Sequence, residues 1–160
     1  MKWGNDFDDP PLQSKILEGL YQGGTDDELT VFRGNKRLAT LNDVRPFDSV
    51  VTLCAHSLPM GWLVKEFRYP FPDGPIDPAT IPEIEALAEW AYSMWKSGER
   101  VLIRCQAGMN RSSLLTALVL MRDGKSADEA ITLIKERRSP YVLSNSHFVK
   151  YLEERGSGDS

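Results

Sequence analysis

A cysteine and an arginine six positions apart have the residue types of a phosphate-transfer site. Cys105 follows the apolar run 101–103, which predicts a buried strand. Arg111 precedes the apolar run 114–121, which predicts a buried helix. Backbone N–H groups of the intervening loop and first helical turn would then surround an anion, and the helix dipole adds partial positive charge there. This field would also stabilise the reactive thiolate form of Cys105, and Arg111 can donate two hydrogen bonds to a phosphoryl group.

The residues between Cys105 and Arg111 complete the predicted phosphate-binding loop. They are Gln106, Ala107, Gly108, Met109 and Asn110, and Ser112 follows Arg111. A buried cysteine that acts as a small apolar side chain is the ordinary alternative for Cys105. That alternative explains neither Gly108 nor Arg111. We therefore predict that Cys105 is a nucleophile and that residues 106–111 bind phosphate.

The stretch Cys105-x-x-Gly108-x-x-Arg111-Ser112 resembles the H-C-x-x-G-x-x-R-[ST] motif of the cysteine-dependent protein tyrosine phosphatase superfamily. It looks most like the dual-specificity branch, and the resemblance covers about residues 16–152. The resemblance implies hydrolysis through a phosphocysteine intermediate, in which Ser112 eases departure of the sulfur. No metal and no other cofactor is implied, because Arg111 and the loop amides supply the positive field.

A phosphocysteine mechanism also needs an acid that protonates the leaving oxygen. The segment Phe71-Pro72-Asp73-Gly74 resembles the Trp-Pro-Asp acid loop of classical tyrosine phosphatases. It stands one predicted helix and one predicted strand before Cys105, as is usual in that family. Asp77 is the competing carboxylate, but it precedes a proline and is well placed to cap the following helix. We predict that Asp73 is the acid and Asp77 is structural; a simple Pro-Asp-Gly turn is the alternative for Asp73.

Two positions raise further questions about the site. Arg104 stands where the family usually has a His that supports the loop and the thiolate. Neighbouring side chains of a strand point to opposite faces, so Arg104 need not touch the phosphate.

Cys54 resembles a cysteine of the phosphoinositide-phosphatase branch that forms a disulfide with the catalytic cysteine under oxidation. A buried apolar cysteine is the more ordinary interpretation of Cys54.

Residues after the loop have weaker signals. Lys135, Arg137 and Arg138 form a basic cluster at a predicted helix end, and we interpret them mainly as a solvated face that complements the helix dipole. Binding of a second phosphate is the alternative. Asn145 and Phe148 resemble the family's late Asn-x-x-Phe stretch, which supports the loop by packing.

Hydrophobic periodicity predicts the elements that must position these residues. Strands, or a hairpin for the first, are expected at 16–23, 49–54, 67–71 and 101–103, and helices at 81–97, 114–121, 127–139 and 146–154. Capping boxes are expected at Thr80/Glu83 and at Ser126/Glu129. This order predicts an α/β fold with a mostly parallel central sheet flanked by helices on both faces, as in the protein-tyrosine-phosphatase-like fold. Ligands of such sheets bind beyond the carboxyl ends of the strands, where Cys105 stands.

Length and composition indicate one domain. The chain has 160 residues, so we expect a flexible N-terminal arm (1–12), one catalytic domain (13–155) and a disordered tail (156–160).

The chain has no run of about 20 apolar residues and no signal-peptide character at its start. Two cysteines, one needed as a free thiolate, favour the cytoplasm. A net charge of −4 disfavours nucleic acid and anionic membranes as partners, and we expect a monomer.

The loop residues bear on the substrate. A phosphoinositide phosphatase is one alternative, because the segment 69–73 also resembles the acid loop of that branch. Gln106, Met109 and Asn110 disfavour it, since they are uncharged, whereas phosphoinositide phosphatases of this superfamily tend to carry lysines there. Asn110 before Arg111 also occurs in RNA 5′-triphosphatases of this fold, which makes an RNA 5′ end the second choice. We expect a shallow pocket that accepts phosphotyrosine and phosphoserine/threonine of a protein or peptide. The non-enzyme alternative is a pseudophosphatase that binds phospho-residues without turnover.

Overall fold

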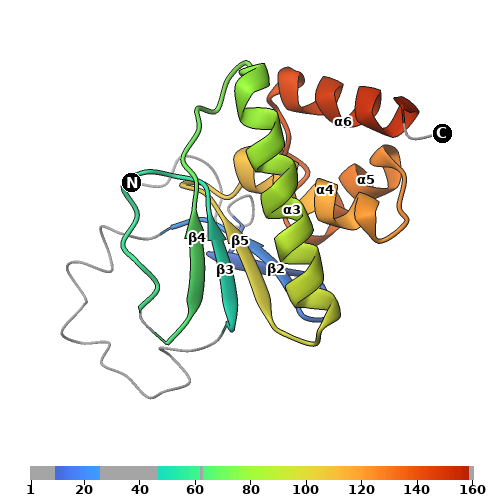
Figure 1. Cartoon of the computed structure of the whole chain (residues 1–160). Coiled ribbons are helices and arrows are strands. Elements are labelled where there is room, and N and C mark those ends of the chain that lie inside the picture. The colour runs from blue at the N-terminus through green and yellow to red at the C-terminus, as the bar shows by residue number, and fades with distance from the viewer. Residues whose placement is uncertain (1–9, 26–46, 62, 159–160) are drawn as a thin grey trace.

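A five-stranded sheet forms the centre of the molecule. The computed structural model describes residues 10–25, 47–61 and 63–158 (Figure 1). The strands are β1 (Gln13–Leu17), β2 (Leu20–Gly23), β3 (Ser49–Thr52), β4 (Lys65–Arg68) and β5 (Val101–Arg104), in the order β1-β2-β5-β3-β4. The β1–β2 hairpin is antiparallel and every other neighbouring pair is parallel. The predicted mostly parallel α/β sheet is therefore confirmed, including the opening hairpin.

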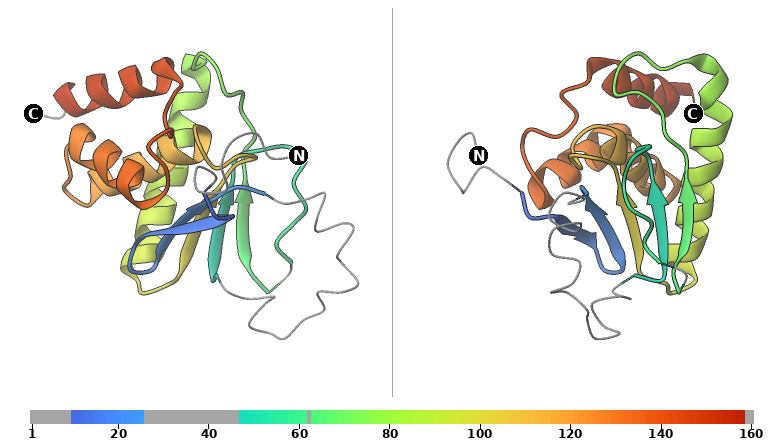
Figure 2. Two further views of the ribbon diagram at one scale, coloured as in Figure 1. Left: turned by 180° about the vertical axis from the view of Figure 1, so that it is seen from behind. Right: turned by 90° about the vertical axis from the view of Figure 1, so that its left-hand side faces the viewer.

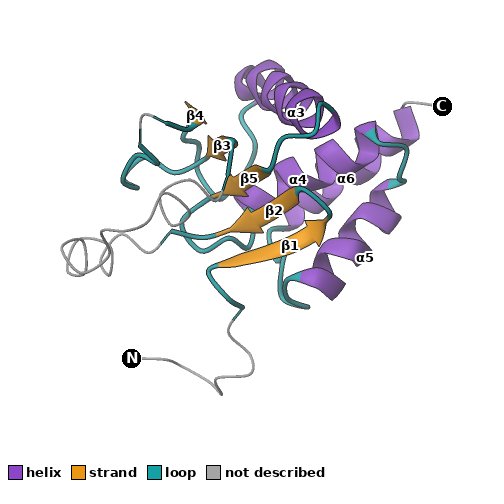
Figure 3. Ribbon diagram, turned by 90° about the horizontal axis from the view of Figure 1, so that it is seen from below, coloured by secondary structure: helices purple, strands orange, loops and turns teal. Residues whose placement is uncertain are grey.

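Four helices pack against one face of this sheet (Figure 2, Figure 3). They are α3 (Ile81–Lys96), α4 (Arg111–Arg122), α5 (Ala127–Arg137) and α6 (Ser146–Gly158), and a 3-10 helix (Pro78–Thr80) precedes α3. Helix α4 is buried continuously from Ser112 to Leu120, since it packs against α3, α5, α6 and the sheet. The opposite face carries a smaller cluster of Phe47, Val50, Val64 and Leu102. A helix on that second face, which was also expected, is absent from the three described stretches.

The helix starts follow local capping chemistry. Ser126 and Glu129 form the predicted capping box at the start of α5. The box predicted at Thr80 is wrong, because Thr80 has a helical backbone and its hydroxyl donates to the Asp77 carbonyl instead. Asp77 itself accepts the backbone N–H of Ala79 at 3.0 Å. Its interpretation as a structural cap is confirmed.

Both predicted ends differ from expectation where they are described. Helix α6 continues through Gly158, so the prediction of disorder is wrong for residues 156–158. Gly156 lies so close to α4 and α5 that a Cβ there would be 3.5 Å from Met121 and Ala127. In the expected N-terminal arm, the carbonyl of Pro11 accepts a hydrogen bond from Arg138 and that of Leu12 accepts one from Gly24. Residues 1–9 and 159–160 lie outside the described residues.

In the described part of the chain, no helix is long and apolar enough to cross a bilayer.

Candidate functional site

Strand β5 and helix α4 hold the Cys105 loop at the carboxyl edge of the sheet. Cys105 directly follows β5, and its backbone N–H donates to the carbonyl of Gly23 at the end of β2 (3.2 Å). Arg111 is the first residue of α4. Cys105 is buried, with 2% of the residue exposed. Cys105 and residues 106–111 thus lie between a strand end and a helix start, and their roles as nucleophile and phosphate-binding loop stay predictions.

Two amides and one hydroxyl surround the sulfur of Cys105. The backbone N–H groups of Gly108 and Ser112 donate to Sγ at 3.3 and 3.4 Å, and Sγ lies 3.3 Å from the Ser112 hydroxyl oxygen. A negative charge on sulfur would be stabilised by these donors and by the N-terminal end of α4.

Gly108 is required by the shape of the loop. Its φ is +72°, in the left-handed region that other residues rarely adopt. A Cβ at this position would be 2.5 Å from the carbonyl carbon of Gly23. The loop therefore needs glycine here both for its turn and for its close contact with β2.

Gln22 joins β2 to the loop, although it was not among the predicted site residues. This fully buried side chain donates from Nε2 to the Ser113 hydroxyl (2.6 Å) and to the Gly108 carbonyl (3.2 Å), and Nε2 also lies 3.2 Å from the Ser112 hydroxyl oxygen. A polar residue in an otherwise apolar strand was the available signal. The amide fixes the hydroxyl that faces the sulfur.

Arg138 supports the loop from behind. Its side chain is buried, so its interpretation as part of a solvated helix face is wrong. The guanidinium donates to the carbonyls of Gly108 (2.6 Å) and Ala107 (3.3 Å), and to the Ser14 hydroxyl (3.0 Å). Burial lowers the pKa of Arg138, whereas the charge of Cys105 acts to raise it. By tying down the outward carbonyls, Arg138 helps the loop amides to point inward.

Arg111 lies at the mouth of the site. Its Nη1 donates to the carbonyls of Leu53 (3.2 Å) and Phe71 (3.0 Å). These carbonyls come from the end of β3 and from the predicted acid loop. The guanidinium is therefore fixed between two segments that are distant in sequence.

Asp73 is held next to the Cys105 loop by two amides. Asn110 donates to one carboxylate oxygen of Asp73 (3.0 Å), and Asn145 donates to the other (2.8 Å). Asn145 also donates to the Gly74 carbonyl at 3.1 Å. Phe148, fully buried, packs edge-to-face on Phe71. The late Asn-x-x-Phe stretch thus supports the site both by packing and by a polar contact to the predicted acid.

A cleft of about 580 Å³ opens between these segments. It is lined by Thr25, Cys54, Ala55, His56, Ser57, Pro70, Phe71, Pro72, Gln106 and Arg111. Its walls are the segment after β3 and the acid loop. Gln106 and Arg111 of the Cys105 loop complete its lining.

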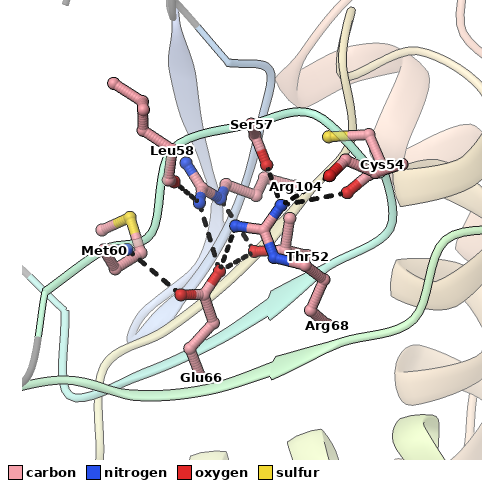
Figure 4. A network of polar contacts seen from close by, with 9 residues as sticks. Thr52, Cys54, Ser57, Leu58, Met60, Glu66, Arg68 and Arg104 are labelled. Atoms are coloured by element: carbon pink, nitrogen blue, oxygen red, sulfur yellow. Dashed lines mark hydrogen bonds and ion pairs between the residues drawn. The ribbon is translucent and has the colours of Figure 1, made fainter.

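Cys54 lines the cleft, whereas Arg104 is not among its lining residues. Cys54 and Cys105 are both free and buried. Arg104 lies on the face of β5 opposite Cys105 and bonds to Thr52, Leu58 and Glu66 (Figure 4). It therefore does not take the place of a loop-supporting His.

The described residues contain no group of three or more His, Cys, Asp and Glu side chains that could hold a metal ion.

Comparison with known proteins identifies a family model. The model for the catalytic domain of dual specificity phosphatases matches residues 42–157, which is more than half of the chain. The match includes the Cys105 loop and the Asp73 segment.

Individual relatives agree with the family match. Human dual specificity protein phosphatase 8 is 29% identical over 145 residues, covering 88% of this chain and 21% of its own length. Human protein tyrosine phosphatase type IVA 3 is 31% identical over 86 residues, covering 54% of this chain and 49% of the relative. The matched part of the chain thus spans about a fifth of the length of the first relative and about half of the length of the second. The crystal structure of human DUSP28 shares the fold, with a TM-score of 0.73 and 21% identity over 93% of this chain and 95% of that one.

Proposed function

Since the chain belongs to the dual specificity phosphatase family, we propose that it hydrolyses phosphomonoesters of proteins through a phosphocysteine intermediate. One observation carries the proposal. The N–H groups of Gly108 and Ser112 converge on the sulfur of Cys105, while Arg111 is fixed at the cleft and Asp73 is held beside the loop. This is the arrangement that a two-step transfer requires.

In the first step, the thiolate of Cys105 attacks phosphorus opposite the ester oxygen. The S–P bond forms as the P–O bond to the substrate breaks. Asp73 in its protonated form gives its proton to the departing oxygen, which leaves as an alcohol or phenol. Arg111 and the loop amides hold the remaining phosphoryl oxygens and match their charge.

In the second step, the Asp73 carboxylate takes a proton from water. The water oxygen bonds to phosphorus as the S–P bond breaks, which releases inorganic phosphate and restores the thiolate. The Ser112 hydroxyl, 3.3 Å from sulfur, donates to the thiolate as it leaves. Gln22 orients this hydroxyl.

The substrates we propose are phosphotyrosine and phosphoserine/threonine in proteins. Among the described residues that line the cleft, Phe71 and His56 carry the aromatic rings, and neither Tyr nor Trp is present, so the lining does not favour a phenyl ring over a short aliphatic side chain strongly. The uncharged Gln106, Met109 and Asn110 offer no cations for an inositol head group or an RNA triphosphate. Asn110 instead donates to Asp73, which gives it a role inside the site.

We also propose a monomeric, cytoplasmic protein, because a nucleophile that acts as a free thiolate favours a reducing compartment. Sedimentation of the purified chain and fractionation of cells test these two points.

A phosphate-release panel tests the function. It contains phosphotyrosine and phosphothreonine peptides, an inositol phosphate and 5′-triphosphate RNA, each assayed with the chain and with Cys105→Ser. We expect release from both peptides by the chain and from no substrate by the variant. Release from the RNA or the inositol phosphate alone would overturn the substrate assignment. Binding of phosphopeptide without release would indicate a pseudophosphatase.

A further inference from the structure

A buried cluster of charges lies on the sheet face opposite the helices (Figure 4). Thr52 of β3 is in register with Arg104 of β5 on one side and with Arg68 of β4 on the other. The three side chains therefore stand in a row at the carboxyl edge of the sheet. Glu66, two residues before Arg68, points to the same face because strand side chains alternate. Residues that follow β3 and β4, Cys54 and Pro70 among them, line the cleft.

Glu66 is the centre of this cluster. Its Oε2 accepts from the Thr52 hydroxyl (2.6 Å), from Arg104 (3.2 Å) and from Arg68 (3.2 Å). Burial acts to raise the pKa of Glu66, but the hydrogen bonds from Thr52 and the Met60 N–H and the charge of Arg104 outweigh it, and the pKa lies below its usual value. The side chain of Arg104 is 8% exposed and that of Glu66 is 13% exposed. Such a shielded ion pair holds its geometry firmly when every polar group has a partner.

The cluster holds the backbone of residues 54–60, which has no regular secondary structure. Arg104 donates to the Leu58 carbonyl (2.7 Å), and Glu66 accepts the Met60 N–H (3.1 Å). Arg68 donates to the Cys54 carbonyl (3.2 Å) and to the Ser57 hydroxyl (2.8 Å). The cluster therefore bonds to this segment at four successive points, Cys54, Ser57, Leu58 and Met60.

Residues 54–57 of the same segment form one wall of the cleft. Immediately before them, the carbonyl of Leu53 accepts a hydrogen bond from Arg111. The charged cluster therefore lies beneath the wall that a bound peptide would meet. It lies on the other side of the sheet from the sulfur of Cys105.

We propose that Arg104, Glu66 and Arg68 are positioning residues that fix residues 54–60 as the rigid wall of the substrate cleft. This inference rests on the proposed phosphatase function. The cluster determines how well the parts of a phosphopeptide around the phosphate fit, whereas the reactivity of Cys105 is set by the loop. Arg104 thus serves peptide recognition from the reverse face of β5.

The test uses Glu66→Gln, which keeps the shape of the side chain and removes its charge. Glu99→Gln is the matched control, since Glu99 also accepts from a hydroxyl, that of Ser49, and from a cation, Lys65, at the opposite end of the sheet. Arg68→Met, at a partly exposed position, is a second variant if Glu66→Gln lowers stability too far. NMR order parameters of residues 54–60 measure wall rigidity without reference to activity.

In Glu66→Gln we expect these order parameters to fall from about 0.85 to below about 0.6, while those of Glu99→Gln do not change. The ratio of kcat/KM for a phosphopeptide to that for a small aryl phosphate should fall about tenfold. The pH profile of Cys105 alkylation should not move. Unchanged order parameters, or a shifted alkylation profile, would overturn the inference. If no substrate were hydrolysed by any form of the chain, the proposed function would fail, yet the order parameters would still decide whether the cluster holds the wall.

Discussion

Arg138 donates a hydrogen bond from its Nε to the carbonyl oxygen of Gly108 across 2.6 Å. A buried cation thus lies directly behind the loop that carries Cys105. Its described hydrogen-bond acceptors are the neutral oxygens of Gly108, Ala107, Pro11, Ser14 and Gln22. The charge of Cys105 acts to raise the pKa of Arg138, against the effect of burial.

Replacing Arg138 by Met should therefore lower the reactivity of Cys105. We expect alkylation of Cys105 at neutral pH to slow about tenfold, because the positive charge behind the loop is removed. Arg137→Met removes an exposed charge from the end of α5 and is the control. Equal alkylation rates for the two variants would rule out an electrostatic role for Arg138.

Replacing Asp73 by Asn should reduce turnover by about 10²–10⁴-fold, the usual size of a general acid–base contribution. The loss should be largest for substrates with a poor leaving group, such as phosphoserine, and small for an activated aryl phosphate. Rates measured across a series of leaving groups test this. Asp77→Asn is the control, since Asp77 caps the 3-10 helix, and an equal loss there would reassign the acid.

Asn145→Ala should lower turnover through its effect on the orientation of Asp73. Removing the donor that lies 2.8 Å from the carboxylate leaves the acid less well oriented, so kcat should fall while Cys105 alkylation is unaffected. Leaving-group kinetics together with alkylation rates measure the two effects separately. A changed alkylation rate would mean that Asn145 supports the loop rather than the acid.

The possible redox partnership of Cys54 with Cys105 remains a prediction. Peroxide should inactivate the chain, and a thiol reductant should restore it, because a disulfide protects the sulfur from irreversible oxidation. In Cys54→Ser, recovery should be lost. Full recovery in that variant would contradict the pairing.

Glu85 links three helices, and its removal should change stability with pH. Its carboxylate accepts from Arg122 (3.0 Å), Tyr151 (2.5 Å) and Arg155 (2.7 Å). Burial acts to raise the pKa of Glu85, but these donors and charges outweigh it and the pKa is lowered. A lowered pKa in the folded state stabilises the fold above the unfolded pKa of about 4.3, and this contribution is lost as pH falls through the folded value.

We therefore expect Glu85→Gln to lower the free energy of unfolding by about 1–3 kcal/mol at pH 7. The difference from the unsubstituted chain should shrink below about pH 4. Urea titrations at several pH values measure it, with the exposed Glu89→Gln as control. A difference that stays constant with pH would contradict the role assigned to the carboxylate.

The sequence predicted what depends on local pattern. Strand and helix periodicity gave the parallel sheet, and the spacing of Cys105, Gly108 and Arg111 placed the loop at its carboxyl edge. Long-range contacts were not predictable in this way. Gln22 and Arg138 meet the loop only after the chain folds, and Glu66 joins two arginines only once three strands are in register. Arg138 in particular was interpreted as part of a solvated helix end. The sequence does not show which member of a basic cluster becomes buried, so its position behind the loop could not be predicted.

The most direct test of the central claim is to trap the intermediate. In Asp73→Asn, the aryloxide of an activated aryl phosphate can leave without an acid as its phosphoryl group passes to Cys105, but water is no longer activated, so a phosphoenzyme should accumulate. Mass spectrometry after rapid denaturation should find one phosphate on the peptide that contains Cys105, and none after Cys105→Ser is added to the variant. Phosphate on another residue, or undiminished hydrolysis by Cys105→Ser, would contradict the account.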